Sequence, residues 1–306
     1  MTGTPRQAPD VVIPDMVARS ADRATTSRQV RWPPKVDLFG VGVSLTDYDE
    51  ATAKILQAAS QGIGGVVSCH AVHALITASG DPSLRARVNT FELVCPDGQP
   101  VRWAVNLLHG LHVADRVYGP TLMLRLCHGA AEAGIPIYLY GGSPVVAERL
   151  EANLVRLYPK LQIAGCEAPP FRPLQPEEDR AVVERINRSG AELVFIGLGC
   201  PKQDLFAHEH RKFLTAVQVC VGAAFDFHAG VKKMAPNWMQ RHGLEWLYRV
   251  SQEPGRLWRR YLVTNSIFLM KLGMALCARA RNRPACVSRS ESTIEHETQA
   301  GVSAGG

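Results

Sequence analysis

Apolar runs alternate with amphipathic segments along most of this chain, and this alternation constrains the fold more than any other feature. The runs span residues 36–45, 64–70, 91–98, 135–144, 161–169, 191–199 and 216–227. The segments between them carry apolar residues at helical spacing. The runs are apolar nearly throughout, as in strands that helices cover on both faces. The sequence therefore predicts a three-layer α/β/α fold with a mostly parallel sheet.

The two ends of the chain differ from this pattern. Residues 1–34 and 286–306 are polar and show neither helical nor strand period, so we predict that both are disordered. Residues 35–245 form the predicted α/β domain, and residues 246–285 form a basic helical appendage. The N-terminus has no apolar core of the signal-peptide type, so we expect a cytoplasmic protein.

The eight cysteines are scattered, and several lie within apolar runs. No CxxC pair occurs among them, which disfavours a zinc site. Reduced thiols in a cytosolic protein are the simplest interpretation.

The C-terminal appendage is strongly basic. Nine Lys or Arg residues occur between Arg241 and Arg283, opposed only by Glu245 and Glu253, which suggests an anionic partner, either a membrane or a nucleic acid. The interleaved apolar run at 266–278 fits a membrane better than DNA. At 13 residues, interrupted by Lys271, it is shorter than the ~20 residues of a spanning helix. We therefore predict peripheral binding to an anionic membrane surface and no nucleic-acid partner.

Several predicted strands end in glycine or polar clusters. These ends are "VVSCH", "LVCPDG", "YLYGGSP" and "FIGLGCPKQ", and a fifth run continues to Asp226. Ligands of open α/β sheets bind beyond the carboxyl ends of the strands, so five such ends favour a ligand cleft there. Turn chemistry explains one or two of them equally well. The "GGSP" stretch is either a phosphate loop or a plain turn.

Four stretches in order carry a resemblance to a known family. They are "RVYGPTLM", "YLYGGSPVVAERLEANLVRLYP", "FIGLGCPKQDLF" and "VGAAFDFHAGVKKMAPNWMQRHGLEWLYRVSQEPGRLWRRYL". Together they resemble the WecG/TagA/CpsF family of glycosyltransferases (glycosyltransferase family 26) over roughly residues 37–269.

The resemblance implies an inverting hexosyltransferase that needs no metal and no cofactor. Such enzymes transfer a sugar from a UDP-sugar to a polyprenyl-diphosphate-linked sugar at the cytoplasmic membrane face, for teichoic acid, enterobacterial common antigen or exopolysaccharide synthesis. A basic C-terminal appendage binds the membrane. The donor stays open among UDP-N-acetylmannosamine, its uronate, UDP-glucose and UDP-glucuronate.

The resemblance also suggests site residues. Asp97 takes the place of the family's catalytic base, and Ser68 and His70 match its "TxN" motif, with histidine replacing asparagine. Arg116 and Gly119 match "RVxGxD", whose acidic position is Thr121 here. "PKQ" supplies Lys202 and Gln203, and "FDF" supplies Asp226.

The chemistry of the transfer gives these residues tasks. Asp97, beside Gly98, suits a base that takes the acceptor's proton, although an Asp-Gly pair is also a common turn. His70 is the rival base, or a contact of the donor sugar. Backbone at Gly141, Gly142 and Gly199, together with Lys202 or Arg116, would stabilise the leaving diphosphate.

The basic appendage has two possible tasks. Arg249, Arg256, Arg259 and Arg260 are the predicted membrane contacts. Three of them, Arg256, Arg259 and Arg260, are also candidates for reaching the diphosphate if the segment closes over the site. The part up to about Tyr248 is equally compatible with a helix packed on the domain.

A second class of function stays open. The change at Ser68 and His70 is compatible with a catalytically impaired, regulatory protein that binds a nucleotide sugar. Retention of Asp97 and Gln203 favours the enzyme.

Overall fold

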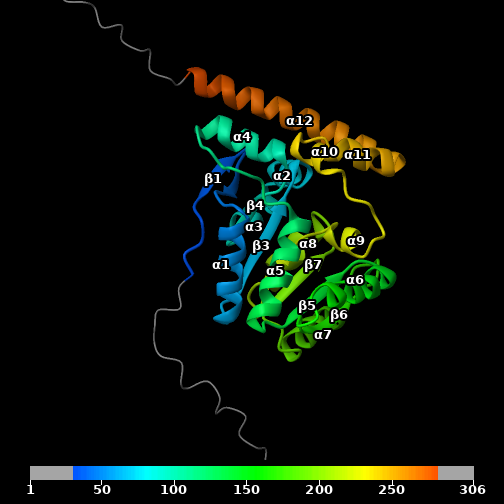
Figure 1. Ribbon diagram of the computed structural model, residues 1–306. Coiled ribbons are helices and arrows are strands. Elements are labelled where there is room, and N and C mark those ends of the chain that lie inside the picture. Colours follow the sequence, from blue (N-terminus) through cyan, green and yellow to red (C-terminus); the bar gives the residue numbers. More distant parts are fainter. Residues whose placement is uncertain (1–29, 282–306) are drawn as a thin grey trace, which may run out of the picture.

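The computed structural model describes residues 30–281 and has a six-stranded parallel sheet at its centre (Figure 1). The strand order is β4-β3-β8-β7-β5-β6, and every neighbouring pair is parallel. The strands are β3 (Gly65–His70), β4 (Leu93–Pro96), β5 (Ile137–Gly141), β6 (Ile163–Glu167), β7 (Leu193–Gly197) and β8 (Val217–Cys220). The predicted fold class is confirmed.

Helices cover both faces of this sheet. One layer consists of α1 (Tyr48–Ser60), α5 (Gly119–Ala133), α6 (Pro144–Leu157) and α9 (Ala224–His228). The other consists of α2 (Val72–Gly80), α3 (Pro82–Asn89), α4 (Gln99–His109), α7 (Pro176–Arg188) and α8 (Lys202–His210). Strand residues alternate between the layers: Leu193 and Phe195 face the first layer, and Val194 and Ile196 face the second.

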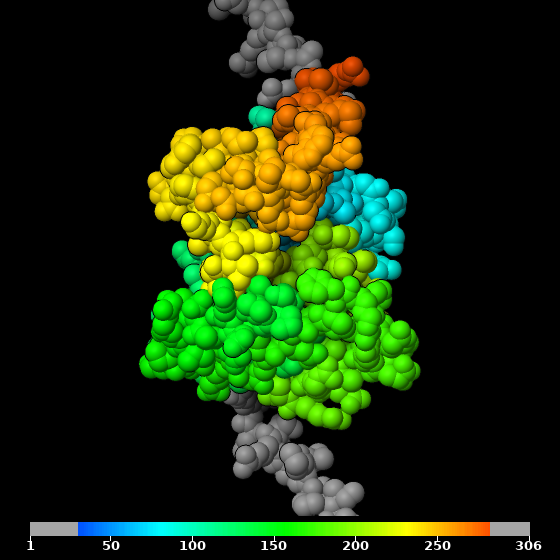
Figure 2. Space-filling view, turned by 90° about the vertical axis from the view of Figure 1, so that its right-hand side faces the viewer, coloured from blue at the N-terminus to red at the C-terminus, as the bar shows by residue number. Residues whose placement is uncertain are grey.

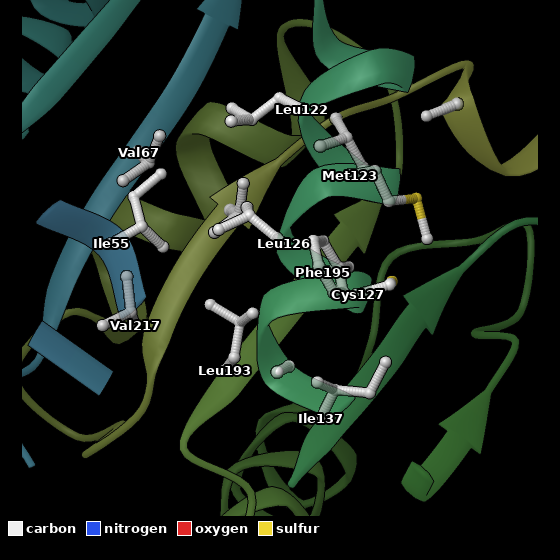
Figure 3. Packing of buried hydrophobic residues seen from close by; sticks show 14 of the residues in the cluster. Ile55, Val67, Leu122, Met123, Leu126, Cys127, Ile137, Leu193, Phe195 and Val217 are labelled. Carbon is white, nitrogen blue, oxygen red and sulfur yellow. The ribbon is translucent and has the colours of Figure 1, made fainter. Parts of the chain in front are cut away.

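The first of the two cores is shown in Figure 3. Leu122 and Leu126 of α5 and Ile55 of α1 pack against Val67 and Phe195 of the sheet, and all five side chains are fully buried. Burial of a large apolar side chain stabilises the fold by about 1.5–3 kcal/mol. Since apolar side chains occupy both faces of each central strand, the strands read as continuous apolar runs.

The run predicted as a first strand is instead an antiparallel hairpin. It consists of β1 (Lys35–Leu38) and β2 (Val41–Ser44), which form a separate sheet. Phe39 and Gly40 turn the chain between them, with φ of 60° and 89°. Both angles lie in the left-handed region of a tight hairpin turn, which interrupts the run.

The strand predicted to reach Asp226 also ends early. β8 stops at Cys220, and Gly222 turns the chain with φ of 53°. Asp226 therefore lies in the short helix α9 rather than at a strand end. Its position close to the carboxyl end of the sheet is retained through this turn.

Three helices complete the described chain: α10 (Asn237–Arg241), α11 (Glu245–Gln252) and α12 (Pro254–Arg281). In Figure 1, α12 lies along the top of the molecule beside α2 and α4, and it contacts both. Packing of this segment on the domain extends well beyond Tyr248, because Leu257, Tyr261 and Phe268 are buried. The sequence left such packing open only up to about Tyr248, and the structure extends it along α12.

Length and composition alone would let α12 cross a bilayer, although core helices of soluble proteins meet the same criterion. One face of α12 is in contact with protein. The ring of Phe268 meets that of Phe39 edge-on, with 5.5 Å between ring centroids. Lys271 Nζ donates to Ser79 Oγ at 3.0 Å, so the charge that interrupts the apolar run points toward the domain.

The opposite face of α12 is apolar and exposed to solvent. It presents Val263, Met270 and Met274, each more than half exposed. Residues 1–29 and 282–306, which include most of the predicted disordered ends, lie outside the described residues.

Candidate active site

A cavity of ≈ 1920 Å³ lies at the carboxyl ends of the strands. Its walls come from the ends of β4, β5, β7 and β8 and from the C-terminal helices α11 and α12. Figure 2 shows this side of the molecule, where α11 and α12 lie above the α/β domain with a hollow between them. The strand ends that the sequence predicts as a ligand cleft therefore meet at one cavity.

Asp97 lies directly after β4 and lines this cavity. Its Oδ2 accepts a hydrogen bond from the Gly119 N–H at 3.4 Å, and a β-carbon on Gly119 would lie 3.5 Å from that oxygen. Burial raises the pKa of Asp97 to about 6, against the lowering effect of Arg116 and with the help of Glu245. A carboxyl group with a pKa near neutrality is suited to proton transfer at physiological pH.

Arg116 is buried beside Asp97 but bonds to the C-terminal helices. Its Nη1 lies 3.0 Å from Glu245 Oε2, and its Nη2 lies 2.8 Å from Gln240 Oε1. The Tyr118 hydroxyl donates to the other Glu245 oxygen at 2.8 Å. The Arg116 guanidinium also lies 4.2 Å above the centre of the Tyr118 ring. This network joins the segment before α5 to α10 and α11.

Glycines bring backbone to the cavity at the ends of β5 and β7. Gly141 has φ of 139°, and a β-carbon there would lie 2.6 Å from the Gly197 backbone. Gly142 and Gly199 also have positive φ, and both line the cavity. Only glycine fits the close approach at Gly141 without strain, and glycine at Gly142 and Gly199 leaves the cavity wall at these turns without side chains.

Gln203, which lines the cavity, supports the turn after β7. Its Oε1 accepts a hydrogen bond from the Gly199 N–H at 3.2 Å, and the residue is buried at the start of α8. Among the contacts of the described residues, its Nε2 donates to no protein acceptor. Lys202, the neighbouring residue, also lines the cavity.

The four arginines predicted at the membrane have two different environments. Arg249, Arg256 and Arg260 line the cavity, and the Arg249 guanidinium lies 5.7 Å from the centre of the Phe227 ring. Arg259 is exposed and does not line the cavity; its guanidinium lies 5.5 Å from the centre of the Trp258 ring. The C-terminal helices therefore contribute positive charge to the cavity itself.

Asp226 lines the cavity within a chain of ion pairs. Its Oδ2 lies 2.8 Å from Lys232 Nζ, which also lies 3.1 Å from Glu253 Oε1. Glu253 in turn pairs with Arg256. This chain is a second polar connection between the α/β domain and the α11–α12 segment.

Ser68 and His70 lie apart from these residues. Both are fully buried in β3, and neither lines the cavity. Ser68 Oγ donates to Asp204 Oδ1 at 2.6 Å, and His70 Nε2 lies 3.5 Å from the same oxygen. The structure thus groups the side chains of this pair with Asp204 of α8; His70 meets Asp97 through the backbone, where the Asp97 N–H donates to the His70 carbonyl at 3.1 Å.

Sequence reasoning missed four residues at this site: Tyr118, Glu245, Gln240 and His73. All but Gln240 line the cavity. Burial, with Arg260 and Arg249 nearby, lowers the pKa of His73 to about 4, so its ring is neutral at physiological pH. The only signal for Glu245 was its position in the motif "GLEWLYR", which gave it no role. Within residues 30–281, no three His, Cys, Asp or Glu side chains cluster as a metal site would require.

An open parallel sheet with glycine-ended strands, a carboxyl group and several cations around one cavity is the arrangement of an α/β enzyme's active site. The particular family follows from a direct comparison. The model of the "Glycosyl transferase WecG/TagA/CpsF family" matches residues 36–283, and the chain belongs to this family. It is therefore a glycosyltransferase of cell-envelope polysaccharide synthesis.

Proposed function

We propose that this protein is an inverting hexosyltransferase that moves a sugar from a UDP-sugar to a polyprenyl-diphosphate-linked sugar. One observation carries the proposal: Asp97 lies in the cavity with a pKa of about 6, near the glycine-ended strands β5 and β7. A carboxyl group and anion-binding backbone in one cavity are the two parts that a metal-independent transfer requires.

In this mechanism Asp97 takes the proton of the acceptor hydroxyl as that oxygen attacks the anomeric carbon. The new C–O bond forms as the bond to the diphosphate breaks, and its electron pair leaves with UDP. Inversion follows because attack and departure occur on opposite faces of the sugar. A positioned base contributes ~100- to 10,000-fold to such a step.

The diphosphate gains negative charge as it leaves. Lys202, Arg249, Arg256 and Arg260 line the cavity and supply positive charge for it. The start of α6 adds the positive end of a helix dipole behind Gly142, with Ser143 as the N-cap, whose Oγ accepts a hydrogen bond from the Val146 N–H. Gln203 is the residue that we propose for a directional hydrogen bond to the nucleotide.

Because the proposed acceptor is a lipid, we assign membrane binding to the C-terminal helices. The exposed apolar face of α12 and the exposed Arg259 support peripheral contact with the anionic inner face of the cell membrane. Arg249 and Arg260 lie on the same two helices but line the cavity. Membrane contact and diphosphate binding are therefore assigned to different faces of one segment.

The decisive experiment is a panel of UDP-sugars, tested for UDP release with a short-chain lipid-diphosphate sugar. We expect one donor to support turnover that Asp97→Asn removes. Binding of a UDP-sugar without turnover, with every acceptor, would favour the catalytically impaired regulatory protein. The motive for that alternative is weak, because the altered residue, His70, does not line the cavity.

A further inference from the structure

The charge of one buried guanidinium, that of Arg116, acts on two carboxylates, Asp97 and Glu245, and the guanidinium bonds directly to Glu245. Both terminal nitrogens of Arg116 are engaged by the C-terminal helices, through Glu245 and Gln240. Within residues 30–281, no ion pair of 4.0 Å or less joins Arg116 to Asp97. Among the hydrogen bonds of the described residues, the Asp97 carboxylate takes part in one, with the Gly119 N–H.

Glu245 is held more firmly than its place on a peripheral helix suggests. Its side chain is 14% exposed, and each of its two oxygens accepts a separate hydrogen bond, one from Arg116 and one from Tyr118. α11 has no buried residues of its own, so apolar packing does little to hold it. The Glu245 contacts therefore fix both the helix and the direction of the Arg116 guanidinium.

We propose that Glu245 is a positioning residue for the reaction: it holds the Arg116 guanidinium on α11, away from Asp97, and so leaves the Asp97 carboxylate free to take the acceptor's proton. This inference rests on the proposed role of Asp97 as the base. If Glu245 is removed, Arg116 loses an anionic partner, and Asp97 is the carboxylate beside it. An Arg116–Asp97 ion pair would stabilise the ionised carboxylate and weaken it as a base.

The titratable and charged groups that face Asp97 come from four parts of the chain. They are Arg116 and Tyr118 before α5, Glu245 and Arg249 of α11, Tyr48 of α1 and Cys69 of β3. Only Glu245 among them is a second carboxylate, and its charge favours the protonated form of Asp97. A change of Glu245 therefore has a distinct signature in the titration of Asp97.

The test compares Glu245→Gln and Glu245→Ala with a matched control, Glu253→Gln. Glu253 is an acid of the same segment that also bonds the domain, through Lys232, but it does not face Asp97. Single-turnover rates are measured from pH 5 to pH 9 with a short-chain, water-soluble acceptor, so that membrane binding does not enter. Thermal unfolding of each variant is measured alongside.

We expect Glu245→Ala to lower the turnover rate at least about tenfold, with the KM of the donor changed less than about threefold. In Glu245→Gln the acidic limb of the pH–rate profile should move to lower pH by about one unit, the size expected when a nearby charge is removed. Glu253→Gln should lower the melting temperature comparably and leave the acidic limb in place. If both Glu245 variants lose only thermal stability and keep the wild-type limb and rate, Glu245 has a structural role and the inference is wrong.

A readout without turnover separates this inference from the proposed function. Carboxyl-labelled aspartate, with the Asp97 signal assigned by its loss in Asp97→Asn, reports the titration of Asp97 directly by NMR. A lower midpoint in Glu245→Gln supports the positioning role even if no donor and acceptor pair gives transfer, which would refute the proposed function alone. An unchanged midpoint in an active enzyme would refute the positioning role alone.

Discussion

The α/β domain and the C-terminal helices are held in place by different forces. α5, in the domain, has eight buried residues, whereas α10 and α11 have none and the 28-residue α12 has four. The C-terminal helices attach through polar contacts, which join Glu245 to Arg116, Glu253 to Lys232 and Lys271 to Ser79, and through the apolar contact of Phe268 with the domain. Ionic contacts weaken with salt and contribute less than apolar cores, so we expect this segment to be less stable than the α/β domain.

The difference places the two halves of the proposed site on parts of unequal stability. The base and the glycine turns belong to the rigid domain, and three cavity arginines belong to the loosely held segment. Variants in each of the two parts should therefore differ in their effects on activity and on stability. The two parts are not independent, because Glu245 of α11 bonds to Arg116, whose charge acts on Asp97.

Deletion of residues 249–306 should have the largest effect. It removes α12 with its exposed apolar face and the arginines of the cavity, so activity on a long-chain lipid acceptor in anionic liposomes should disappear, together with liposome binding. Circular dichroism and cooperative thermal unfolding should show that the domain still folds. Salt-sensitive liposome binding that survives the deletion in full would contradict the assignment of α12 as the membrane contact.

Asp97→Asn should lower the single-turnover rate by about 100- to 10,000-fold, because the amide cannot take the acceptor's proton. Donor affinity, measured by calorimetry, should stay within a few-fold, because the donor's binding groups are elsewhere in the cavity. A turnover rate within threefold of wild type would remove Asp97 from the role of base.

Gly141→Ala should destabilise the domain by about 2–5 kcal/mol. The new β-carbon would lie 2.6 Å from the Gly197 backbone, and φ of 139° is unfavourable for alanine. Gly134→Ala is the matched control, since its φ is also positive, at 67°, but its β-carbon meets nothing within 4 Å. We expect the control to cost about 1–2 kcal/mol in urea unfolding; equal losses in the two variants would mean that the close approach is unimportant.

The Asp97→Asn variant should also be more stable than the wild type, by an amount that depends on pH. The folded-state pKa of Asp97 is raised from 3.8 to about 6, so the protonated form favours folding. This contribution is complete below about pH 4 and is lost as the pH rises through 6. At pH 8, Asp97→Asn should therefore raise the free energy of unfolding by about 1–3 kcal/mol, with little difference at pH 4. A stabilising effect that is the same at both pH values would contradict the raised pKa.

Gln203→Ala and Asp226→Ala should have the smallest effect. Each removes one proposed hydrogen bond to the UDP-sugar, which costs about 0.5–1.5 kcal/mol, or roughly 2- to 12-fold in affinity. Asp226 already pairs with Lys232, so its variant also alters the contact between the domain and α11–α12. Unchanged affinity in both variants, measured by calorimetry, would place the nucleotide elsewhere in the cavity.

Local sequence determined the layered fold and much of the site. Continuous apolar runs predicted a sheet covered on both faces, because strands such as β7 present apolar side chains to both layers. The stretches that carry Asp97, Gly142, Gly199, Lys202 and Gln203 were predicted to meet because parallel strands bring their carboxyl ends to one edge of the sheet, and the family resemblance singled out Asp97, Lys202 and Gln203 among them. The apolar pattern did not predict the turns within two of the runs. The hairpin turn at Gly40 and the early end of β8 were therefore missed.

Only the tertiary structure decided which side chains reach the cavity. Ser68 and His70 follow the motif but point into a buried contact with Asp204. Lys271 interrupts an apolar run in sequence, yet it faces Ser79 and leaves the outer side of α12 apolar. Glu245 meets Arg116 across 129 positions of the chain. Hydropathy and spacing record a residue's near neighbours in the chain, whereas such contacts depend on how separate helices and strands pack, and no local pattern encodes that.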